Sequence, residues 1–282
     1  MTERPRLRRP LPKNRSLEQV WHHYQVESAI ARRLLAAARD ERPAILATMY
    51  DELFAEVPDH PRLMRRTDSE RTRRAIRSKR SILDSYVTAE STVLEFAPGD
   101  CRFAATLAHD VAQVIGVDIS DQRATDQAWP TNFDLIVYDG STISGLDAAS
   151  IDVVFSDQLI EHLHPDDALD HLGLCASLLR PGGHYVIRTP HRVGGPWDVS
   201  RYFCDSAEGF HLREWTFGEL RNAMLASGFR RVHTIWNGKG VRLRLPWWLL
   251  VTYERAVDRL PKRWARRLMA ATIPTVACVG VR

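Results

Sequence analysis

The sequence predicts an α/β fold in which a helical region precedes a mostly parallel β-sheet. From residue 92 onward, short apolar runs alternate with helical stretches, which is the pattern of buried strands joined by crossover helices. Before residue 92 no run has the character of a strand, and apolar residues recur at helical spacing instead. With 282 residues, of which 44% are hydrophobic, the chain can bury a core without covalent staples.

Three segments are predicted along the chain. Residues 1–15 are basic and lack an apolar run, so we expect a disordered tail. Residues 16–90 are predicted to be helical, beginning at a capping box formed by Ser16 and Gln19 and broken at Pro58 and Pro61. Residues 91–282 are predicted to form the sheet domain, which is interrupted by a helical insert at about 246–271.

Seven segments are the predicted strands, and the first five of them are short apolar runs. A helix between the fifth and sixth strands begins at a second capping box, Thr216 with Glu219, and ends before Gly228. The predicted strands are Thr92–Phe96, Val114–Val117, Phe133–Tyr138, Ile151–Ser156, Tyr185–Thr189, Arg231–Ile235 and Val276–Val281.

Composition excludes several classes of protein. The four cysteines form no C-x-x-C pair, so neither a zinc site nor a disulfide framework is predicted, and a cytoplasmic location fits best. No run approaches the roughly 18 apolar residues of a membrane span. The net charge of +4 comes with arginine-rich stretches, which are typical of solvated helix faces but leave a nucleic-acid surface open as an alternative.

Chemistry-bearing residues lie where the first two strands end. The first strand runs into Glu95-Phe96-Ala97-Pro98-Gly99, and the second ends in Asp118. In an open parallel sheet, ligands bind beyond the carboxyl ends of the strands, so both groups face one site. Small residues let a ligand approach the backbone, and an acid at the next strand end can accept hydrogen bonds from a ribose. Together they predict a site for an adenosine-containing cofactor.

The turn favours S-adenosylmethionine (SAM) over a dinucleotide. With Ala97 and Gly99 as the first two small residues of a G-x-G-x-x-G pattern, the third position is Arg102, which cannot pack closely beside a pyrophosphate. SAM has no phosphate, and its ammonium and sulfonium groups suit a nearby carboxylate such as Glu95. The alternative for Glu95 is a carboxylate that only caps the turn.

Four ordered motifs resemble those of the class I SAM-dependent methyltransferases. They are Val93–Gly99, Val117-Asp118, Ile151–Ser156 continuing through Glu161-His162-Leu163, and Leu178–Gly183. The resemblance covers about residues 90–235. It implies a Rossmann-like sheet of seven strands with an antiparallel last strand, and SAM as the cofactor.

The glycine-rich turn departs from the family pattern E/D-x-G-x-G-x-G at two positions. Ala97 stands in place of the first glycine and Cys101 in place of the third. Alanine is small enough if its φ is negative, and cysteine is tolerated if its side chain points away from the cofactor. We expect cofactor binding to survive both changes.

The resemblance assigns the cofactor residues by position. Glu95, Ala97 and Gly99 would line the amino-acid end of SAM, and Asp118 would hold the ribose. The remaining assignments, Asp139 or Gly140 beside the adenine and Asp157 with Gln158 over the methionine part, come from the ends of the third and fourth strands. For Asp157 a helix-capping role is the alternative.

Three histidines are candidates for the base that takes a proton from the methyl acceptor. His191 follows the fifth strand, His162 lies at the fourth motif, and His211 lies in a loop expected over the pocket. Some quinone O-methyltransferases carry E-x-x-E-H at the fourth motif. Here the first position of that cluster is Gln158, so no metal site is predicted.

The acceptor is predicted only as a class. The fourth strand lacks the N/D-P-P-Y/F/W motif of DNA amino-methyltransferases. The segment 194–203 lies where family members place substrate-recognition loops, and it is similar to sequences in bacterial enzymes acting on glycans or secondary metabolites. We expect O-methylation of a small polar molecule such as a sugar, glycan or natural product. The alternatives are a nucleic-acid methyltransferase and a non-catalytic SAM-binding scaffold.

The insert suggests an additional contact surface. Trp247-Trp248 is followed by basic residues up to Arg267, a pattern that suits either a membrane surface with a lipid-linked acceptor or, more often, cover for the sheet edge or a homodimer contact.

Overall fold

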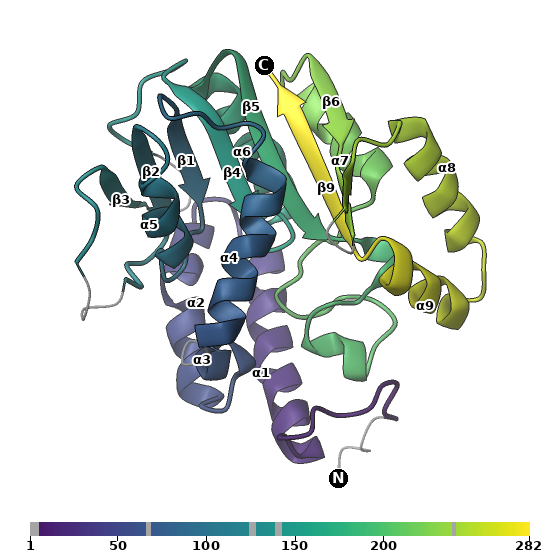
Figure 1. Cartoon of the computed structure of the whole chain (residues 1–282). Helices are drawn as coiled ribbons and strands as arrows, with labels where there is room; N and C mark the ends of the chain where they lie inside the picture. Colours follow the sequence, from purple (N-terminus) through teal and green to yellow (C-terminus); the bar gives the residue numbers. More distant parts are fainter. Residues whose placement is uncertain (1–5, 66–68, 124–127, 139–142, 239–240) are drawn as a thin grey trace.

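The computed structural model describes residues 6–65, 69–123, 128–138, 143–238 and 241–282. Its centre is a seven-stranded sheet in the order β3-β2-β1-β4-β5-β9-β6 (Figure 1). Strands β1 to β5 run parallel, and β9 lies antiparallel between β5 and β6. This confirms the predicted Rossmann-like sheet with an antiparallel last strand.

All seven predicted strands are present. The largest difference is that the fifth begins six residues earlier than predicted, because its chain pairs with β4 from Leu179 onward. The strands are β1 (Thr92–Phe96), β2 (Gln113–Asp118), β3 (Phe133–Val137), β4 (Ile151–Asp157), β5 (Leu179–Pro190), β6 (Arg231–Thr234) and β9 (Thr275–Val281).

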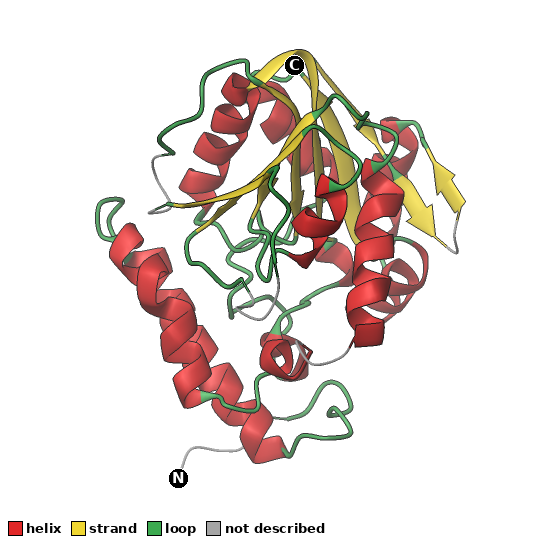
Figure 2. Cartoon of the chain, turned by 60° about the vertical axis from the view of Figure 1, so that its left-hand side comes forward, coloured by secondary structure: helices red, strands yellow, loops and turns green. Residues whose placement is uncertain are grey.

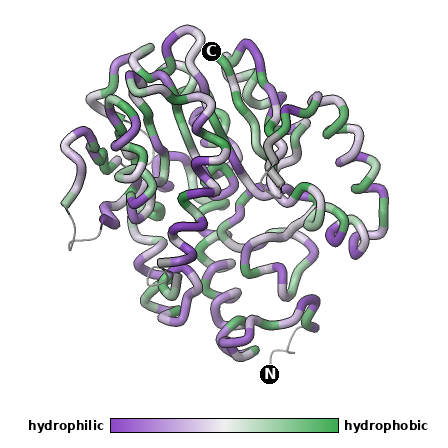
Figure 3. The backbone as a smooth tube through the Cα atoms, viewed as in Figure 1, coloured by the Kyte–Doolittle hydropathy of each residue, from purple (hydrophilic) through white to green (hydrophobic). Residues whose placement is uncertain are grey.

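Helices cover both faces of the sheet (Figure 2). Helices α4 (Ser69–Leu83) and α5 (Arg102–Ala108) bury one face, whereas α6 (Pro165–Leu178) and α7 (Phe217–Ala226) bury the other. The strands between them are predominantly hydrophobic, as expected for a sheet buried on both faces (Figure 3). Both predicted capping boxes are present, at the start of α7 and at the start of α1.

The N-terminal helices lie beyond the carboxyl ends of the parallel strands (Figure 1). Helices α1 (Leu17–Ala36) and α2 (Arg42–Glu56) share a small core with Phe210 of the later chain, and α3 (Pro61–Arg65) follows them. This region therefore covers the edge of the sheet at which ligands bind in such folds.

The described part of the predicted disordered tail is packed. Arg8 donates its backbone N–H to the carbonyl of Tyr202, and Arg15 donates to Asp59 at 2.7 Å. Arg15 is buried. Arg8 and Arg15 thus contact the folded chain through partners that are themselves partly exposed, and disorder of the tail stays a prediction.

The insert after β6 begins with the unpredicted hairpin β7 (Trp236–Gly238) and β8 (Val241–Leu243), which precedes α8 (Trp247–Asp258) and α9 (Lys262–Thr272). Inward residues of α8 and α9, including Leu250 and Met269, join the main core, while Trp248 and Trp264 remain exposed. Among the described residues, no helix is long and apolar enough to cross a membrane. Contact of this insert with a membrane surface or a second copy stays a prediction.

Candidate functional site

A cavity of about 1080 Å³ lies between the carboxyl edge of the sheet and the N-terminal helices. One side is formed by the ends of β1, β2 and β4, through Gly99, Asp118 and Asp157. The opposite side is formed by α1 to α4 and by the loops around the 3₁₀-helices η1 (Arg192–Gly194) and η2 (Val199–Tyr202). Its volume reaches the upper end of ordinary ligand pockets, which leaves room for two ligands.

Asp118 ties the first two strand ends together. Its Oδ2 accepts a 3.0 Å hydrogen bond from the backbone N–H of Gly99, and its Oδ1 accepts one from Ile119 at 2.8 Å. Asp118 is buried and lines the cavity. The carboxylate therefore fixes the turn after β1 and has lone pairs left for a ligand.

The turn has left-handed backbone at Ala97 and Cys101, the two positions where another residue replaces a glycine of the family pattern. Ala97 has φ +53°, so the condition of a negative φ is not met, and the strain at this residue costs about 1 kcal/mol. Cys101 has φ +57°, but its side chain is fully buried in the core beside Phe103. The thiol thus points away from the cavity, as required for cofactor binding.

Glu95 is paired with a lysine that sequence analysis missed. Lys79, from α4, places Nζ 2.8 Å from Oε1 of Glu95, and Lys79 lines the cavity. Burial lowers the pKa of Lys79, but the carboxylates of Glu95 and Asp157 outweigh this and raise it on balance. Oε2 of Glu95 is buried without a hydrogen-bond partner among the described residues. The sequence signal for this pair was the basic helix α4, which comes directly before the strand that carries Glu95.

Asp157 is held by Arg188 of the neighbouring strand in a two-point ion pair at 2.6 and 2.7 Å. Burial raises the pKa of Asp157, but this cation lowers it overall. Gln158 follows with φ +61° and also lines the cavity. Asp157 does not cap α6, whose N-cap is His164. The predicted adenine contacts, Asp139 and Gly140, lie outside the described residues.

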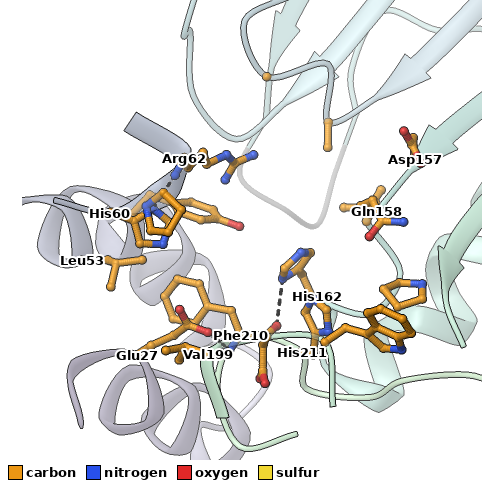
Figure 4. A pocket seen from close by; sticks show the side chains of 18 of the residues that line it. Glu27, Leu53, His60, Arg62, Asp157, Gln158, His162, Val199, Phe210 and His211 are labelled. Carbon is orange, nitrogen blue, oxygen red and sulfur yellow. Dashed lines mark hydrogen bonds between the residues drawn. The ribbon is translucent and has the colours of Figure 1, made fainter. Parts of the chain in front are cut away.

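His162 and His211 both line the cavity and lie side by side (Figure 4). Their ring centroids are 5.0 Å apart. Nδ1 of His162 is 2.9 Å from the carbonyl of Phe210, so this nitrogen donates and Nε2 keeps a lone pair. Burial, with the charges of His211 and Arg62, lowers the pKa of His162 well below 6.5.

His211 carries a charge that His162 lacks. Burial lowers its pKa, but a 2.8 Å hydrogen bond to Glu214 and the nearby acids raise it to about 9. Glu161 lies close to both histidines, fully buried, with one oxygen bonded to Thr189 and Oε1 without a partner among the described residues. Burial raises the pKa of Glu161 to about 7.

The placement expected for His191 is wrong. Its ring is fully buried outside the cavity, with Nε2 3.1 Å from Oε2 of Glu254 on α8. Its Nδ1 accepts the backbone N–H of Val193 and so caps η1. Because both nitrogens are used internally, the ring cannot face an acceptor.

The segment 194–203 does border the cavity, as expected of a recognition loop, through Trp197, Asp198 and Tyr202. Asp198 accepts the backbone N–H of Gly209 at 2.8 Å. Glu27 of α1 accepts the N–H of Phe210 at 2.9 Å. Two buried carboxylates from distant parts of the chain thus hold the loop that carries His211.

Comparison with known proteins identifies the sheet domain. Residues 94–187 match the family described as Methyltransferase domain. A probable S-adenosylmethionine-dependent methyltransferase of Mycolicibacterium smegmatis is 32% identical over 153 residues. Residues 94–187 of the chain are a methyltransferase domain. The alignment covers 53% of this chain and 56% of the relative, so the chain spans about half the length of that methyltransferase.

Other methyltransferases share parts of the sequence or the fold. Phosphoethanolamine N-methyltransferase 1 of Triticum aestivum is 30% identical over 114 residues, which are 38% of this chain and 22% of the wheat protein. The structure of the Burkholderia thailandensis 1,6-didemethyltoxoflavin-N1-methyltransferase, with S-adenosylhomocysteine bound, has TM-score 0.53 at 18% identity and covers 87% of this chain and 91% of its own. The structure of a SAM-dependent methyltransferase of Archaeoglobus fulgidus has TM-score 0.52 at 17% identity, and the match covers 74% of this chain and 94% of that one.

SAM is the cofactor of this methyltransferase domain, and the residues present suit it. The unpartnered buried oxygen of Glu95 is an acceptor for an ammonium group, although Glu95 lies behind Lys79 and is not among the residues that line the cavity. A Cβ added at Gly99 would meet open space, which shows that the turn leaves room beside the backbone. The carboxylate of Asp118 faces the same cavity.

Proposed function

We propose that the chain transfers a methyl group from SAM to a hydroxyl of a small polar acceptor such as a sugar, a glycan or a secondary metabolite. The observation that carries this proposal is one shared cavity, in which the strand ends of the sheet face apolar, aromatic and polar side chains from the N-terminal helices and from segment 194–211. SAM supplies a methyl group on a positively charged sulfur, and the protein's task is to align an acceptor oxygen with it and to exclude water.

The amino-acid end of SAM is assigned to Lys79, Glu95 and Asp157. These three charges meet at the carboxyl ends of β1 and β4. The ammonium of Lys79 suits the carboxylate of SAM, and the unpartnered Oε2 of Glu95 suits its amino group. Asp118, at the end of β2, is assigned to the ribose hydroxyls.

The acceptor is assigned to the other half of the cavity. It is lined by His162, His211, Tyr50 and Tyr202. Imidazole and phenol groups can hydrogen-bond a hydroxylated molecule, and their rings can pack against it. A long polymer does not fit into a cavity of about 1080 Å³, so a glycan would enter by its end.

Calorimetric titration with SAM, S-adenosylhomocysteine and, separately, NAD tests the cofactor half of the proposal. Binding of the first two at micromolar concentration without binding of NAD supports it. Binding of NAD alone, or of none of the three, contradicts it and favours the scaffold alternative.

Transfer of a labelled methyl group from SAM tests the acceptor half. A panel of hydroxylated glycans and metabolites is compared with the same molecules after their hydroxyls have been acetylated, and with amine analogues and RNA. Label that appears in the free hydroxyl compounds alone supports O-methylation. Label in the amines or in RNA contradicts it.

A further inference from the structure

Two groups of side chains near the cavity have the composition of a metal site. One consists of His23, Glu27 and His60, and the other of Glu161, His162 and His211. In each group the potential ligand atoms lie within 4.8 Å of one another. The hydrogen bonds around the two groups differ, and this difference separates them.

The first group is satisfied internally. His23 uses both ring nitrogens, Nδ1 with Arg15 at 2.9 Å and Nε2 with Glu27 at 2.7 Å. The second oxygen of Glu27 accepts the backbone N–H of Phe210. Because His23 has no lone pair to spare and Arg15 adds a positive charge, an ion has no place there.

The second group is not satisfied internally. Glu161 is 0% exposed, and its Oε1 has no hydrogen-bond partner among the described residues. An unpaired buried carboxylate oxygen costs about 1–3 kcal/mol, so it marks a place where a partner belongs. Oε2 is fixed by Thr189 at 2.9 Å, which holds the carboxylate in place.

The two histidines are oriented through their Nδ1 atoms. His162 uses Nδ1 with the carbonyl of Phe210, and His211 uses Nδ1 with the carboxylate of Glu214. Histidines that bind metals are held in this way, by a carbonyl or a carboxylate at the nitrogen that does not bind the ion. Nε2 of His162 therefore keeps a lone pair for a ligand role, and Nε2 of His211 can take the same role once the ion displaces its proton.

We propose that Glu161, His162 and His211 bind one divalent transition-metal ion at the acceptor end of the cavity. Two imidazoles and one carboxylate suit Zn²⁺, Fe²⁺ or Co²⁺ rather than Mg²⁺ or Ca²⁺. Ligand bonds of about 2.1 Å separate two ligand atoms by at most about 4.2 Å, so side-chain shifts of under about 1 Å close the site. His162 and His211 line the cavity, so the ion's open positions face the acceptor.

The role of this ion rests on the proposed function. An acceptor hydroxyl bound to the ion loses its proton to solvent more readily, since a metal lowers the pKa of a bound O–H group. The oxygen then bonds to the methyl carbon, the carbon–sulfur bond breaks, and its electron pair stays on sulfur. The products are the methyl ether, S-adenosylhomocysteine and one proton.

Metal binding is tested without an activity assay. The full-length, tag-free protein is treated with a chelator, dialysed and titrated with Zn²⁺ by calorimetry and with Co²⁺ by visible absorption. We expect one ion per chain, d–d bands of a four- or five-coordinate Co²⁺, and no binding of Mg²⁺. Glu161→Gln and His211→Gln should each weaken Zn²⁺ binding by more than about tenfold.

Two control variants keep the test specific. His109→Gln removes an exposed histidine, and His60→Gln removes a member of the first group; both should retain one ion per chain. Binding of S-adenosylhomocysteine shows that each variant is folded. No Zn²⁺ binding by wild type, or binding unchanged in both Glu161→Gln and His211→Gln, overturns the inference.

The two proposals fail separately. Cofactor binding and methyl transfer by the chelated protein, without metal binding, would leave the proposed function in place and remove the ion. Stoichiometric metal binding that depends on Glu161, in a protein that does not bind SAM, would do the reverse.

Discussion

Lys79 and Glu95 form a 2.8 Å ion pair that joins helix α4 to strand β1. Lys79 lies outside the stretch 94–187 that matches the methyltransferase family, whereas Glu95 lies within it. The lysine ammonium also lies 4.9 Å from the ring centre of Phe103. A helix of the N-terminal region therefore lines the same cavity as the strand ends of the matched domain.

Lys79→Met should weaken S-adenosylhomocysteine binding by at least about tenfold, because a charge-assisted hydrogen bond of about 1.5–3 kcal/mol is lost. Binding of 5′-methylthioadenosine, which lacks the amino-acid part, should change less than about twofold. Calorimetry with both ligands on the same variant separates a lost contact from a damaged fold. Arg80→Met, one residue along the same helix, is the matched control. Equal losses for both ligands would show that Lys79 only supports α4.

Asp118→Ala should weaken SAM binding by at least about tenfold, since both ribose contacts and the anchor of Gly99 disappear. Asp118→Asn keeps one acceptor oxygen and should lose less. Fluorescence or calorimetric titration gives both constants. An unchanged affinity in Asp118→Ala would remove Asp118 from the cofactor site.

His191→Ala and His162→Gln should have opposite effects. His191→Ala leaves Glu254 buried without one of its partners, so we expect a destabilisation of about 1–3 kcal/mol and a fall of several degrees in the melting temperature. Turnover per folded molecule should stay within about twofold. His162→Gln should reduce turnover by at least about tenfold with unchanged affinity for S-adenosylhomocysteine. The opposite result would be a fall in turnover per folded molecule in His191→Ala but not in His162→Gln. It would assign the role in methyl transfer to His191 and the structural role to His162.

His171 should make the protein sensitive to mild acid. Its pKa is lowered by burial from 6.5 to about 4, and its Nε2 is 2.8 Å from the hydroxyl of Tyr185. As the pH falls, His171 is protonated in the unfolded chain at about pH 6.5 but in the folded protein only at about pH 4. The contribution of neutral His171 to the free energy of unfolding is therefore complete above pH 6.5. It is lost as the pH falls toward about 4, for a total of about 3 kcal/mol.

Chemical denaturation at several pH values checks this prediction. His171→Gln should be less stable than wild type at pH 7.5, but should lose less of its remaining stability between pH 6.5 and 4. Parallel curves for the two proteins would show that His171 is not responsible.

Much of the fold was predictable because most of the strands are short apolar runs with clear boundaries, the exception being β6 with its sequence Arg-Val-His-Thr. The positions of Glu95 and Asp118 at the carboxyl ends of β1 and β2 were predictable for the same reason, and their roles toward the cofactor stay predictions. Ala97 shows the limit of this reasoning. The need for a left-handed φ at that position is set by the link from its N–H to Val117, which is a tertiary contact.

Contacts between distant segments were not predictable. His191 follows a strand just as the cofactor acids do, yet Glu254 from the late insert draws its ring into the core. The pairing of Glu161 with His211 depends on how a loop 50 residues later is fastened by Glu27 and Asp198. The spacing of the fourth motif showed that Gln158 replaces a possible metal-binding carboxylate. It could not show that His211, from a distant loop, lies beside Glu161.

The hydrogen bond between Glu27 and Phe210 joins residues 183 apart in the chain, whereas Lys79–Glu95 and Gly99–Asp118 join residues 16 and 19 apart. Closing the longer loop costs more chain entropy and requires the chain to have been synthesised as far as Phe210. On the ribosome, the half of the cavity assigned to the nucleoside can therefore take shape while the chain is still growing. The half assigned to the acceptor is assembled later, when α1 meets the loop that carries Phe210.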